Sequence, residues 1–493
     1  MSKIAQREPV KAFVEQPPRI KHLTVSYEVK ARGGHRTSLP SLNLAEIRQL
    51  ALKDPRTMLN RSKISELKSQ QDGPVTIGGW VETLRDQKRI QFIIIRDESG
   101  SVQVTYPRPS EEDSLADQVS ALTHGSFVIV KGQLKHDERV KLGGIEILLE
   151  GLEVVSASLP DSPIAEDTSI DKRLDWRFID FRRPELNLMM QVQTTIEQAW
   201  REHWLANDFV EIHSPKLMAS PSESHAELFK LEYFEGHAYL AQSPQFYKQM
   251  AMSAGLNRVF EIGPVFRADP SFTSRHATEF VSIDMEMSWI DSHEDVMSFQ
   301  EELMVKAITA VKQKHGERIK ELYEIDSEIP STPFPRIPLA EAHEIIEKRG
   351  YKVPRTDGDL DPEGERQISQ YAKEELGHEF VFLTDYPKHI RPFYHMRHED
   401  NDALTKSYDL IWKGTEITTG AQREHRIEVL EAQAKDKGLD PEGLEFYMDF
   451  FRYGVPPHGG FGMGLTRVVM LMLELPNIRE ASFLFRGPNR LQP

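Results

Sequence analysis

The stretch Arg258-Val-Phe-Glu-Ile-Gly-Pro-Val-Phe-Arg267 decides the fold, together with Thr278-Glu-Phe-Val-Ser-Ile-Asp-Met-Glu-Met-Ser-Trp-Ile290, which follows it after a polar loop. In the second segment polar and apolar residues alternate, the period-two pattern of a half-buried strand. One side of this strand would carry Thr278, Phe280, Ser282, Asp284, Glu286 and Ser288, and the other Val281, Ile283, Met285, Met287 and Trp289. We therefore expect two strands joined by a cationic loop.

The loop between the two strands contains Arg275-His276 and begins next to Arg267. An enzyme that grips a polyphosphate needs fixed guanidinium groups, because they donate paired hydrogen bonds in a rigid plane. A structural protein has little use for such cations beside a strand face that holds Asp284 and Glu286. The segment therefore favours a nucleotide site.

A strand ending in Phe-Arg, a loop with Arg-His and a second strand with Asp-x-Glu-Met resemble motif 2 of the class II aminoacyl-tRNA synthetases. Within that class the chain is most similar to the aspartate enzymes of the archaeal and eukaryotic type. Further segments occur in the family's order, namely Ala241-Gln-Ser-Pro-Gln-Phe-Tyr-Lys-Gln249, Gly414-Thr-Glu-Ile-Thr-Thr-Gly-Ala-Gln-Arg423 and the glycine-rich residues 459–475. The resemblance extends over residues 75–493. Several linked motifs in order are more specific than any single one.

The resemblance implies an α+β fold, with an N-terminal OB-fold barrel followed by a class II catalytic domain built on an antiparallel sheet flanked by helices. Composition agrees, because 493 residues with 39% hydrophobic content can form several domains with real cores. The absence of cysteine excludes disulfides, thiolate nucleophiles and cysteine-bound zinc. The first ten residues lack an apolar signal core, and no later stretch is long and apolar enough to span a bilayer, so we expect a cytoplasmic protein without a membrane partner.

The net charge of -16 argues against a nucleic-acid partner, but the charge is unevenly distributed. Residues 1–70 hold 14 Lys and Arg against 6 Asp and Glu, a net of +8, which leaves -24 for the rest. We expect residues 1–72 to be a basic, poorly ordered extension with a short helix over 42–52. Its function stays open between a solvated tail and a segment that attracts tRNA.

Residues 73–158 alternate in short strands with the spacing of a small barrel. The segment 79–97 resembles the OB-fold anticodon-binding domain of the class IIb synthetases. The resemblance implies that Phe92 stacks on an anticodon base, and that Gln103 and Glu146 read base edges. The alternative is that Phe92 belongs to the barrel core.

Residues 159–185, rich in Pro, Asp and Ser, are expected to be a hinge, and residues 186–493 the catalytic domain. We expect a helix over 186–207 and an insertion over about 310–400, where charged runs alternate with Pro and Gly. The segment Phe209-Val-Glu-Ile-His-Ser-Pro215 resembles motif 1, which implies a homodimer through the region around Pro215.

A site for aspartate must distinguish a side-chain carboxylate from the neutral amide of asparagine, which calls for buried cations. The resemblance places Lys248 and Arg423 at this carboxylate, and Glu223 at the substrate ammonium. The set implied for aspartate is Glu223, Gln245, Lys248, Arg267, Thr419 and Arg423, of which Arg267, Arg423 and Lys248 are the expected catalytic residues. The alternative for Lys248 is a solvated charge on a helix.

For ATP, the resemblance makes Arg267 the clamp between the α-phosphate and the substrate carboxylate. Arg275 and His276 would hold the outer phosphates, and Phe280 and Arg467 would enclose adenine. The full set expected at ATP is Arg267, Ala268, Asp269, Arg275, His276, Ala277, Phe280, Glu416, Gly464, Leu465, Thr466 and Arg467. Mg²⁺ prefers oxygen ligands, so the resemblance makes Glu416 and Thr419 its expected protein contacts. Without the resemblance, Glu416 would be interpreted as an ordinary carboxylate on a strand.

The chain departs from the family's pattern at three places. Asp269 stands where the family usually has Glu, Thr466 replaces the usual Glu before Arg467, and Leu484-Phe-Arg-Gly487 replaces the common Phe-Pro-Arg-Asp ending. Because two carboxylates on the ATP side are shortened or lost, we hypothesise a weakened ATP affinity.

The resemblance implies a ligase that activates L-aspartate with ATP and transfers it to the 3′ end of tRNA(Asp), with tRNA(Asn) as an open second acceptor. One alternative is a paralogue that adenylates aspartate but uses a different acceptor. Another, from a different class, is a non-catalytic RNA-binding or regulatory protein. For the ligase, the expected partners are tRNA, L-aspartate and ATP, with Mg²⁺ as the metal.

Overall fold

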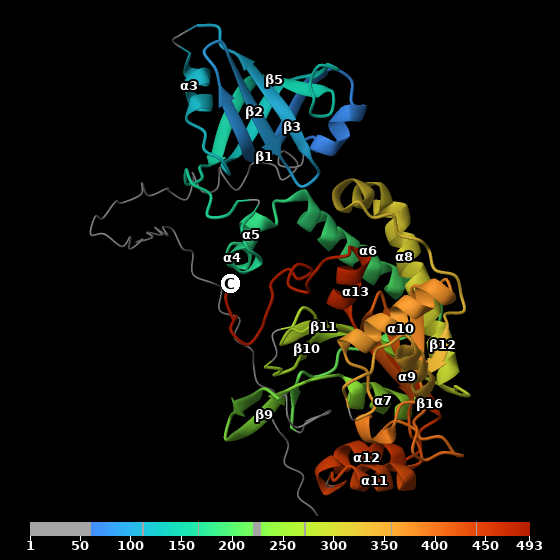
Figure 1. Ribbon diagram of the computed structural model, residues 1–493. Coiled ribbons are helices and arrows are strands. Elements are labelled where there is room, and N and C mark those ends of the chain that lie inside the picture. The colour runs from blue at the N-terminus through green and yellow to red at the C-terminus, as the bar shows by residue number, and fades with distance from the viewer. Residues whose placement is uncertain are drawn as a thin grey trace, which may run out of the picture. The chain divides into compact units, whose positions relative to one another are not determined.

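The computed structural model describes residues 61–110, 113–165, 167–219, 228–270, 273–355, 357–439 and 441–493 (Figure 1). These residues fall into two compact units, one reaching to Ser162 and the other starting at Pro163. The helix expected over 42–52 lies outside the described residues, as does most of the basic extension. Within the described ranges, no helix has both the length and the apolarity needed to cross a bilayer.

The first unit is a closed barrel whose described strands follow the order β1-β2-β3-β5-β4. The strands are β1 (Gly73–Asp86), β2 (Ile90–Arg96), β3 (Ser101–Pro107), β4 (Phe127–His136) and β5 (Ile145–Ser156), with η1 (Ile64–Ser69) and α3 (Ser114–Ser120) beside them. Alternate residues such as Ile93, Ile95, Val102 and Val104 are fully buried inside. A side chain at Gly79 would collide with the backbone of the next strand, so the barrel closes only because this position has no Cβ.

The second unit is built on a sheet of eight described strands in the order β12-β13-β14-β15-β16-β11-β10-β6. Their bounds are β6 (Val210–Glu211), β10 (Arg258–Phe266), β11 (Glu279–Ser288), β12 (Arg336–Pro338), β13 (Phe380–Thr384), β14 (Ser407–Trp412), β15 (Thr415–Gln422) and β16 (His458–Gly464). The two edge pairings, β12 with β13 and β6 with β10, are parallel, and the others are antiparallel. The two strands predicted from the opening stretch are confirmed as the antiparallel pair β10 and β11.

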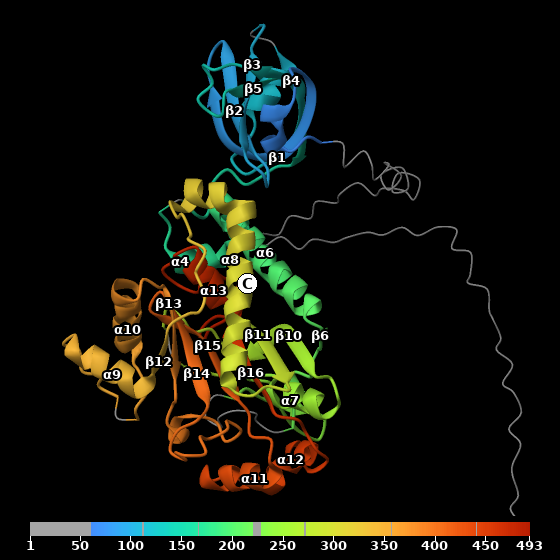
Figure 2. The same cartoon turned by 90° about the vertical axis from the view of Figure 1, so that its right-hand side faces the viewer.

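The main core lies between one face of this sheet and the helices α6 (Pro184–Ala206), α8 (His293–Tyr323) and α13 (Leu465–Met472). Helices α6 and α8 run side by side (Figure 2), and the buried Trp200 of α6 donates a hydrogen bond to the carbonyl oxygen of Leu303 at 3.0 Å. Ile283 and Met285 of β11 contribute to this core, as their position in the alternating pattern predicts. The opposite side of β11 is therefore left for polar groups.

A second core lies among α7 (Gln245–Ser253), α11 (Ile427–Asp436) and α12 (Glu445–Arg452). A small sheet, with strands in the order β7-β9-β8, consists of β7 (Leu217–Met218), β8 (Lys230–Tyr233) and β9 (Gly236–Leu240). The remaining short helices are α4 (Ile170–Asp175), α5 (Arg177–Asp180), η2 (Lys388–Ile390) and η3 (Pro441–Leu444).

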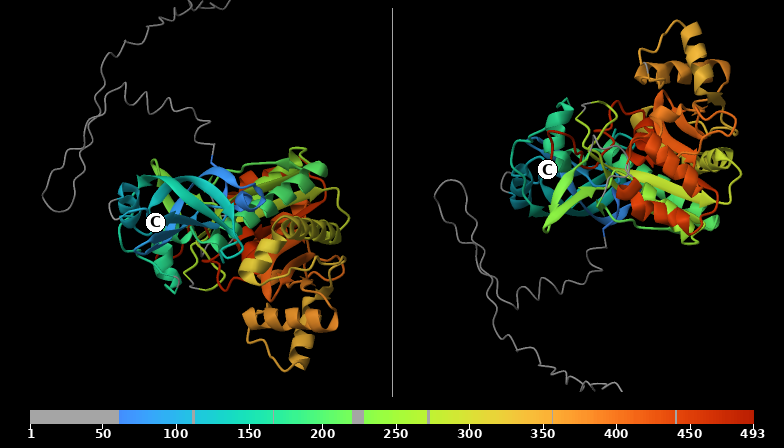
Figure 3. Two further views of the ribbon diagram at one scale, coloured as in Figure 1. Left: turned by 90° about the horizontal axis from the view of Figure 1, so that it is seen from above. Right: turned by 90° about the horizontal axis from the view of Figure 1, so that it is seen from below.

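Two helices come between β12 and β13 in the sequence, namely α9 (Leu339–Lys348) and α10 (Pro362–Glu375). They pack on β12 and β13 through a separate apolar cluster that includes Ile346 and Ile368, and they lie beyond the edge of the sheet (Figure 3). Within the range 310–400, where we expect an insertion, the first residues still belong to α8, which runs without interruption to Tyr323. The part that stands outside the sheet is thus the pair α9 and α10.

Candidate active site

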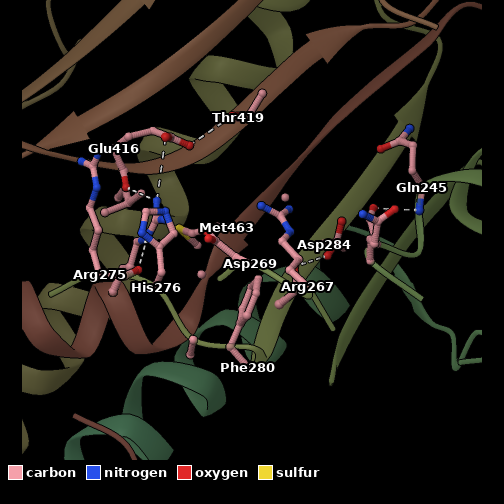
Figure 4. Close-up of a pocket in the computed structure, with 18 of the residues that line it drawn as sticks. Gln245, Arg267, Asp269, Arg275, His276, Phe280, Asp284, Glu416, Thr419 and Met463 are labelled. Atoms are coloured by element: carbon pink, nitrogen blue, oxygen red, sulfur yellow. Dashed lines mark hydrogen bonds and ion pairs between the residues drawn. The ribbon is translucent and has the colours of Figure 1, made fainter. Parts of the chain in front are cut away.

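A cavity of about 410 Å³ opens on the polar side of the sheet (Figure 4). Strand β16 forms part of its wall and can do so because of its glycines, since a Cβ on Gly460 would collide with the carbonyl oxygen of Met285 on β11. In Figure 4, Arg267 lies between one end that holds Glu416 and Arg275 and another end that holds Gln245. The cavity is thus elongated, with an arginine near its middle.

Most of the residues expected at ATP line this cavity: Arg267, Asp269, Arg275, His276, Ala277, Phe280, Glu416, Gly464, Thr466 and Arg467. Two do not, because Leu465 is buried in the main core and Ala268 lies off the wall. Of the residues expected at aspartate, Gln245, Arg267, Thr419 and Arg423 line it. Glu223 lies outside the described residues.

Arg423 is fixed in place by three partners. Its Nε donates to Oε1 of Glu286 at 3.0 Å, one Nη to the ring of His395 at 2.9 Å, and the other Nη to the carbonyl oxygen of Gly460 at 2.8 Å. Burial lowers the pKa of Arg423, but the charge and hydrogen bond of Glu286, together with the nearby Tyr394 and Tyr408, outweigh burial and raise it. The guanidinium is therefore a permanent, oriented cation on the cavity wall.

His395 is 2% exposed, and burial holds the pKa of its imidazole well below the ordinary value. The ring is therefore neutral at physiological pH, and its Nε2 accepts the hydrogen bond from Arg423. Sequence reasoning missed this residue, because nothing in Arg391-Pro-Phe-Tyr-His395 marks the histidine as a partner of an arginine 28 positions further on.

Lys248 is buried behind the cavity wall rather than on it. Its Nζ lies 3.0 Å from Oδ1 of Asp284 and 3.4 Å from Oε2 of Glu286, and it donates to the carbonyl oxygen of Phe461 at 2.9 Å. With 2% of its side chain exposed, Lys248 is no solvated helix charge, so that alternative is wrong. Asp284, which forms this ion pair with Lys248, lines the cavity itself.

At the other end, Arg467 donates to the carbonyl oxygens of Glu416 at 2.8 Å and Arg275 at 3.3 Å. The guanidinium of Arg267 lies 5.5 Å from the centre of the Phe280 ring, within cation–π range. Burial raises the pKa of Glu416, but the charges of Arg467 and neighbouring arginines outweigh burial and hold it below the ordinary value. This end therefore presents guanidinium groups around the ionised carboxylate of Glu416.

The residues expected at Mg²⁺ lie together, because the hydroxyl of Thr419 donates to Oε1 of Glu416 at 3.2 Å. Among the described residues, no group of three or more His, Cys, Asp or Glu side chains could enclose a metal ion. A single carboxylate beside a hydroxyl suits Mg²⁺, which takes one or two protein oxygens and fills its shell with phosphate and water. The donor set thus fits an ion that arrives with a polyphosphate.

Arg391 also lines the cavity and was not expected from the sequence. Its Nη2 lies 2.7 Å from Oδ2 of Asp409, and its guanidinium lies 3.6 Å from the centre of the Tyr386 ring. Burial raises the pKa of Asp409 to about 6. A usable signal existed, since an aspartate within the apolar run Tyr408-Asp-Leu-Ile-Trp412 requires a buried partner.

In the barrel, Phe92, Gln103 and Glu146 lie on neighbouring strands and face outward. Gln103 pairs with Glu146 across β3 and β5 and donates to its carboxylate at 3.2 Å. Phe92 is half-buried, whereas Gln91 and Ile93 on either side are fully buried, so Phe92 is not part of the barrel core. The same face carries an ion pair between Glu82 and Arg96, which sequence reasoning missed.

Two family models match the chain. An OB-fold nucleic acid binding domain matches residues 75–155, and the tRNA synthetases class II (D, K and N) match residues 169–486. Since the second match covers more than half of the chain, the chain belongs to the class II tRNA synthetases of the D, K and N group. It is therefore an aminoacyl-tRNA ligase by family.

The chain is similar to curated relatives over nearly their whole length. It is 43% identical to the aspartate–tRNA(Asp/Asn) ligase of Aeropyrum pernix, over 87% of this chain and 98% of the relative. It is 42% identical to the aspartate–tRNA(Asp) ligase of Pyrococcus abyssi, over 88% of this chain and all of the relative. Among solved structures, the asparaginyl-tRNA synthetase of Pyrococcus horikoshii in complex with asparaginyl-adenylate has a TM-score of 0.82 and 34% identity, over 88% of this chain and all of that one.

Proposed function

We propose that the chain is an aspartate–tRNA ligase. It would activate L-aspartate with ATP to aspartyl-adenylate, release pyrophosphate, and transfer the aspartyl group to the 3′-terminal ribose of tRNA(Asp). The observation that carries the amino-acid assignment is Arg423, a buried cation held by three partners on the wall of the cavity. The curated relatives support the same substrate, because both are aspartate ligases by name.

Recognition of the aspartate side chain would rest on the N–H donors of Arg423 that its partners do not use. A guanidinium group has five N–H donors, and three of them are used by partners among the described residues. The remaining two match the two oxygens of a carboxylate. The amide of asparagine would turn an NH₂ group toward the same donors, and the site would leave that group unpaired.

Adenylate formation would be governed by position and charge. Arg267, in the middle of the cavity, would hold the aspartate α-carboxylate and the α-phosphate in line, so that the carboxylate oxygen attacks phosphorus and pyrophosphate leaves. Arg275 and His276 would stabilise the outer phosphates, and Arg467 would pack on the adenine. When bound at Glu416 and Thr419, Mg²⁺ would supply charge neutralisation between the phosphates.

Transfer to tRNA would depend on the barrel, whose outward face carries Phe92, Gln103 and Glu146. Phe92 would stack on an anticodon base, and Gln103 and Glu146 would read base edges. The chain's acceptor is either tRNA(Asp) alone or both tRNA(Asp) and tRNA(Asn), and the relatives' names include both cases.

Charging assays with labelled aspartate, ATP and Mg²⁺ test the proposal, using separate transcripts that bear the aspartate and the asparagine anticodons. Charging of the first transcript alone would mean that the ligase discriminates between the two anticodons. Charging of both would mean that the barrel accepts either anticodon. Adenylate formation without charging of either would favour the paralogue with a different acceptor. Asparagine as the activated amino acid would overturn the assignment.

We further propose a cytoplasmic homodimer that forms through the motif 1 region. The region around Pro215 is flanked by Val210 and Leu217, whose exposed fractions of 46% and 49% are high for aliphatic side chains. Sedimentation velocity at micromolar concentration would reveal a dimer, and a monomer under those conditions would contradict this part of the proposal.

A further inference from the structure

A closed ring of hydrogen bonds lies at the proposed ATP end of the cavity and includes a residue that no sequence motif indicated. Oε2 of Glu365 accepts from Nη1 of Arg275 at 2.6 Å and from the backbone N–H of Glu416 at 2.9 Å. Arg467 completes the ring, because it donates to the carbonyl oxygens of both Arg275 and Glu416. Four residues from four separate segments thus hold one another in place.

Glu365 reaches this ring from α10, outside the edge of the sheet. It is 5% exposed and does not line the cavity, so it cannot contact a ligand there directly. A buried carboxylate without partners is costly. Within the part of the chain that the structure describes, the Glu365 carboxylate has hydrogen-bond partners only in the loop after β10 and at the start of β15. The carboxylate of Glu365 therefore acts on the Arg275 side chain and on the Glu416 backbone.

Burial lowers the pKa of Arg275, but the hydrogen bond and charge of Glu365 outweigh burial and raise it. Without Glu365, Arg275 would lose its oriented partner and the Glu416 peptide would lose the acceptor for its N–H. Arg467 would lose order as well, because both of its acceptors belong to those two residues.

We propose that Glu365 is a positioning residue for ATP, by which the α9 and α10 insertion sets the geometry of Arg275, Arg467 and Glu416. This inference rests on the proposed function only for the identity of the nucleotide. It assigns Glu365 no contact with substrate and no part in the proton or phosphoryl chemistry.

The experiment compares Glu365→Gln and Glu365→Ala with the intact chain in aspartate-dependent ATP–pyrophosphate exchange. Glu365→Gln is expected to raise the KM for ATP about ten- to a hundredfold, the effect of one lost charge-assisted hydrogen bond. The KM for aspartate should stay within about twofold, because Arg423 lies outside the ring. Glu363→Gln is the matched control, since Glu363 lies on the same helix and bonds only to Arg366 and Gln367 of that helix among the described residues.

A cycle with Arg275→Gln separates positioning from general destabilisation. Because Glu365 acts partly through Arg275, the losses of ATP binding in the two single variants should add to more than the loss in the double variant. Additive effects, an unchanged ATP KM in Glu365→Gln, or a parallel loss in both substrates with a lowered melting temperature would each overturn the proposal. Calorimetric titration with ATP alone applies the same comparison if the intact chain shows no aspartate-dependent exchange, an outcome that would instead count against the proposed function.

Discussion

Two cations and two carboxylates form a buried charged centre at the proposed aspartate end of the cavity: Lys248, Arg423, Asp284 and Glu286. Their charges balance, and backbone carbonyls take up further donors. Such a network is stable only when complete, since removing one member leaves an unpaired charge in a low-dielectric region. The same network fixes Arg423, so stability and the proposed recognition of aspartate would depend on the same groups.

Lys248→Met is expected to lower the free energy of unfolding by roughly 3 to 5 kcal/mol, because it leaves Asp284 and Glu286 buried without their lysine. Urea titration of the full chain, followed by tryptophan fluorescence, measures this. Lys230→Met, an exposed lysine on β8, is the control and should change little. A loss below about 1 kcal/mol for Lys248→Met would mean that the pair is solvated in solution.

Thr466→Glu is expected to lower the KM for ATP about fivefold. A carboxylate beside Arg467 would add an ion pair worth about 1 kcal/mol and would orient the guanidinium. Arg467 at present has only the Glu416 side chain as an ionic partner among the described residues, at 3.8 Å. Pyrophosphate exchange at varied ATP gives the answer, and an unchanged ATP KM would count against the hypothesis of weakened affinity.

The stability of the chain should fall as the pH drops from neutral toward 4, in part because of His458. Burial lowers the pKa of His458 from the ordinary 6.5 to about 4. Between these values the unfolded chain binds a proton that the folded chain does not, so acid favours unfolding by about 2 kcal/mol between pH 7 and pH 5. His458→Gln should have a shallower pH dependence of its unfolding free energy, and identical slopes would refute this role.

At the scale of single elements, β16 is notable because four of its seven residues are glycines. It runs between β11 and β15, where neighbouring side chains and carbonyl groups leave no room for a Cβ at Gly460. Gly459 and Gly460 therefore permit the close pairing of β16 with its two neighbouring strands.

Gly460→Ala should destabilise the second unit by roughly 3 kcal/mol or more, since the new Cβ collides with the Met285 carbonyl oxygen and backbone must move. Thermal unfolding monitors the change. Gly464→Ala is the matched control on the same strand, because its Cβ would lie 3.7 Å from the nearest atom, an ordinary contact. Equal melting temperatures for both variants would mean that the strand tolerates a side chain at 460.

At the scale of the whole molecule, the sites that we propose for adenylation and for tRNA recognition lie in separate compact units. Phe92→Ala should therefore reduce kcat/KM for tRNA charging about 5- to 100-fold, the loss of one base–aromatic stack, and leave pyrophosphate exchange unchanged. Both assays use the same preparation of the full chain. Leu148→Ala, which removes an outward-facing aliphatic group from β5, tests whether any truncation on the barrel surface has this effect. A loss of exchange in Phe92→Ala would contradict the separation.

Local sequence determined the strand pair β10 and β11, the barrel strands and most of the cavity wall, because a period of two and linked motifs are visible over short distances. Tertiary structure alone decided that Lys248 pairs with Asp284, that His395 supports Arg423, and that Glu365 reaches Arg275. The partners in these pairs are 28 to 90 positions apart. Only the packing of the sheet and its insertion brings them within hydrogen-bond distance, and no local pattern records which buried charge meets which.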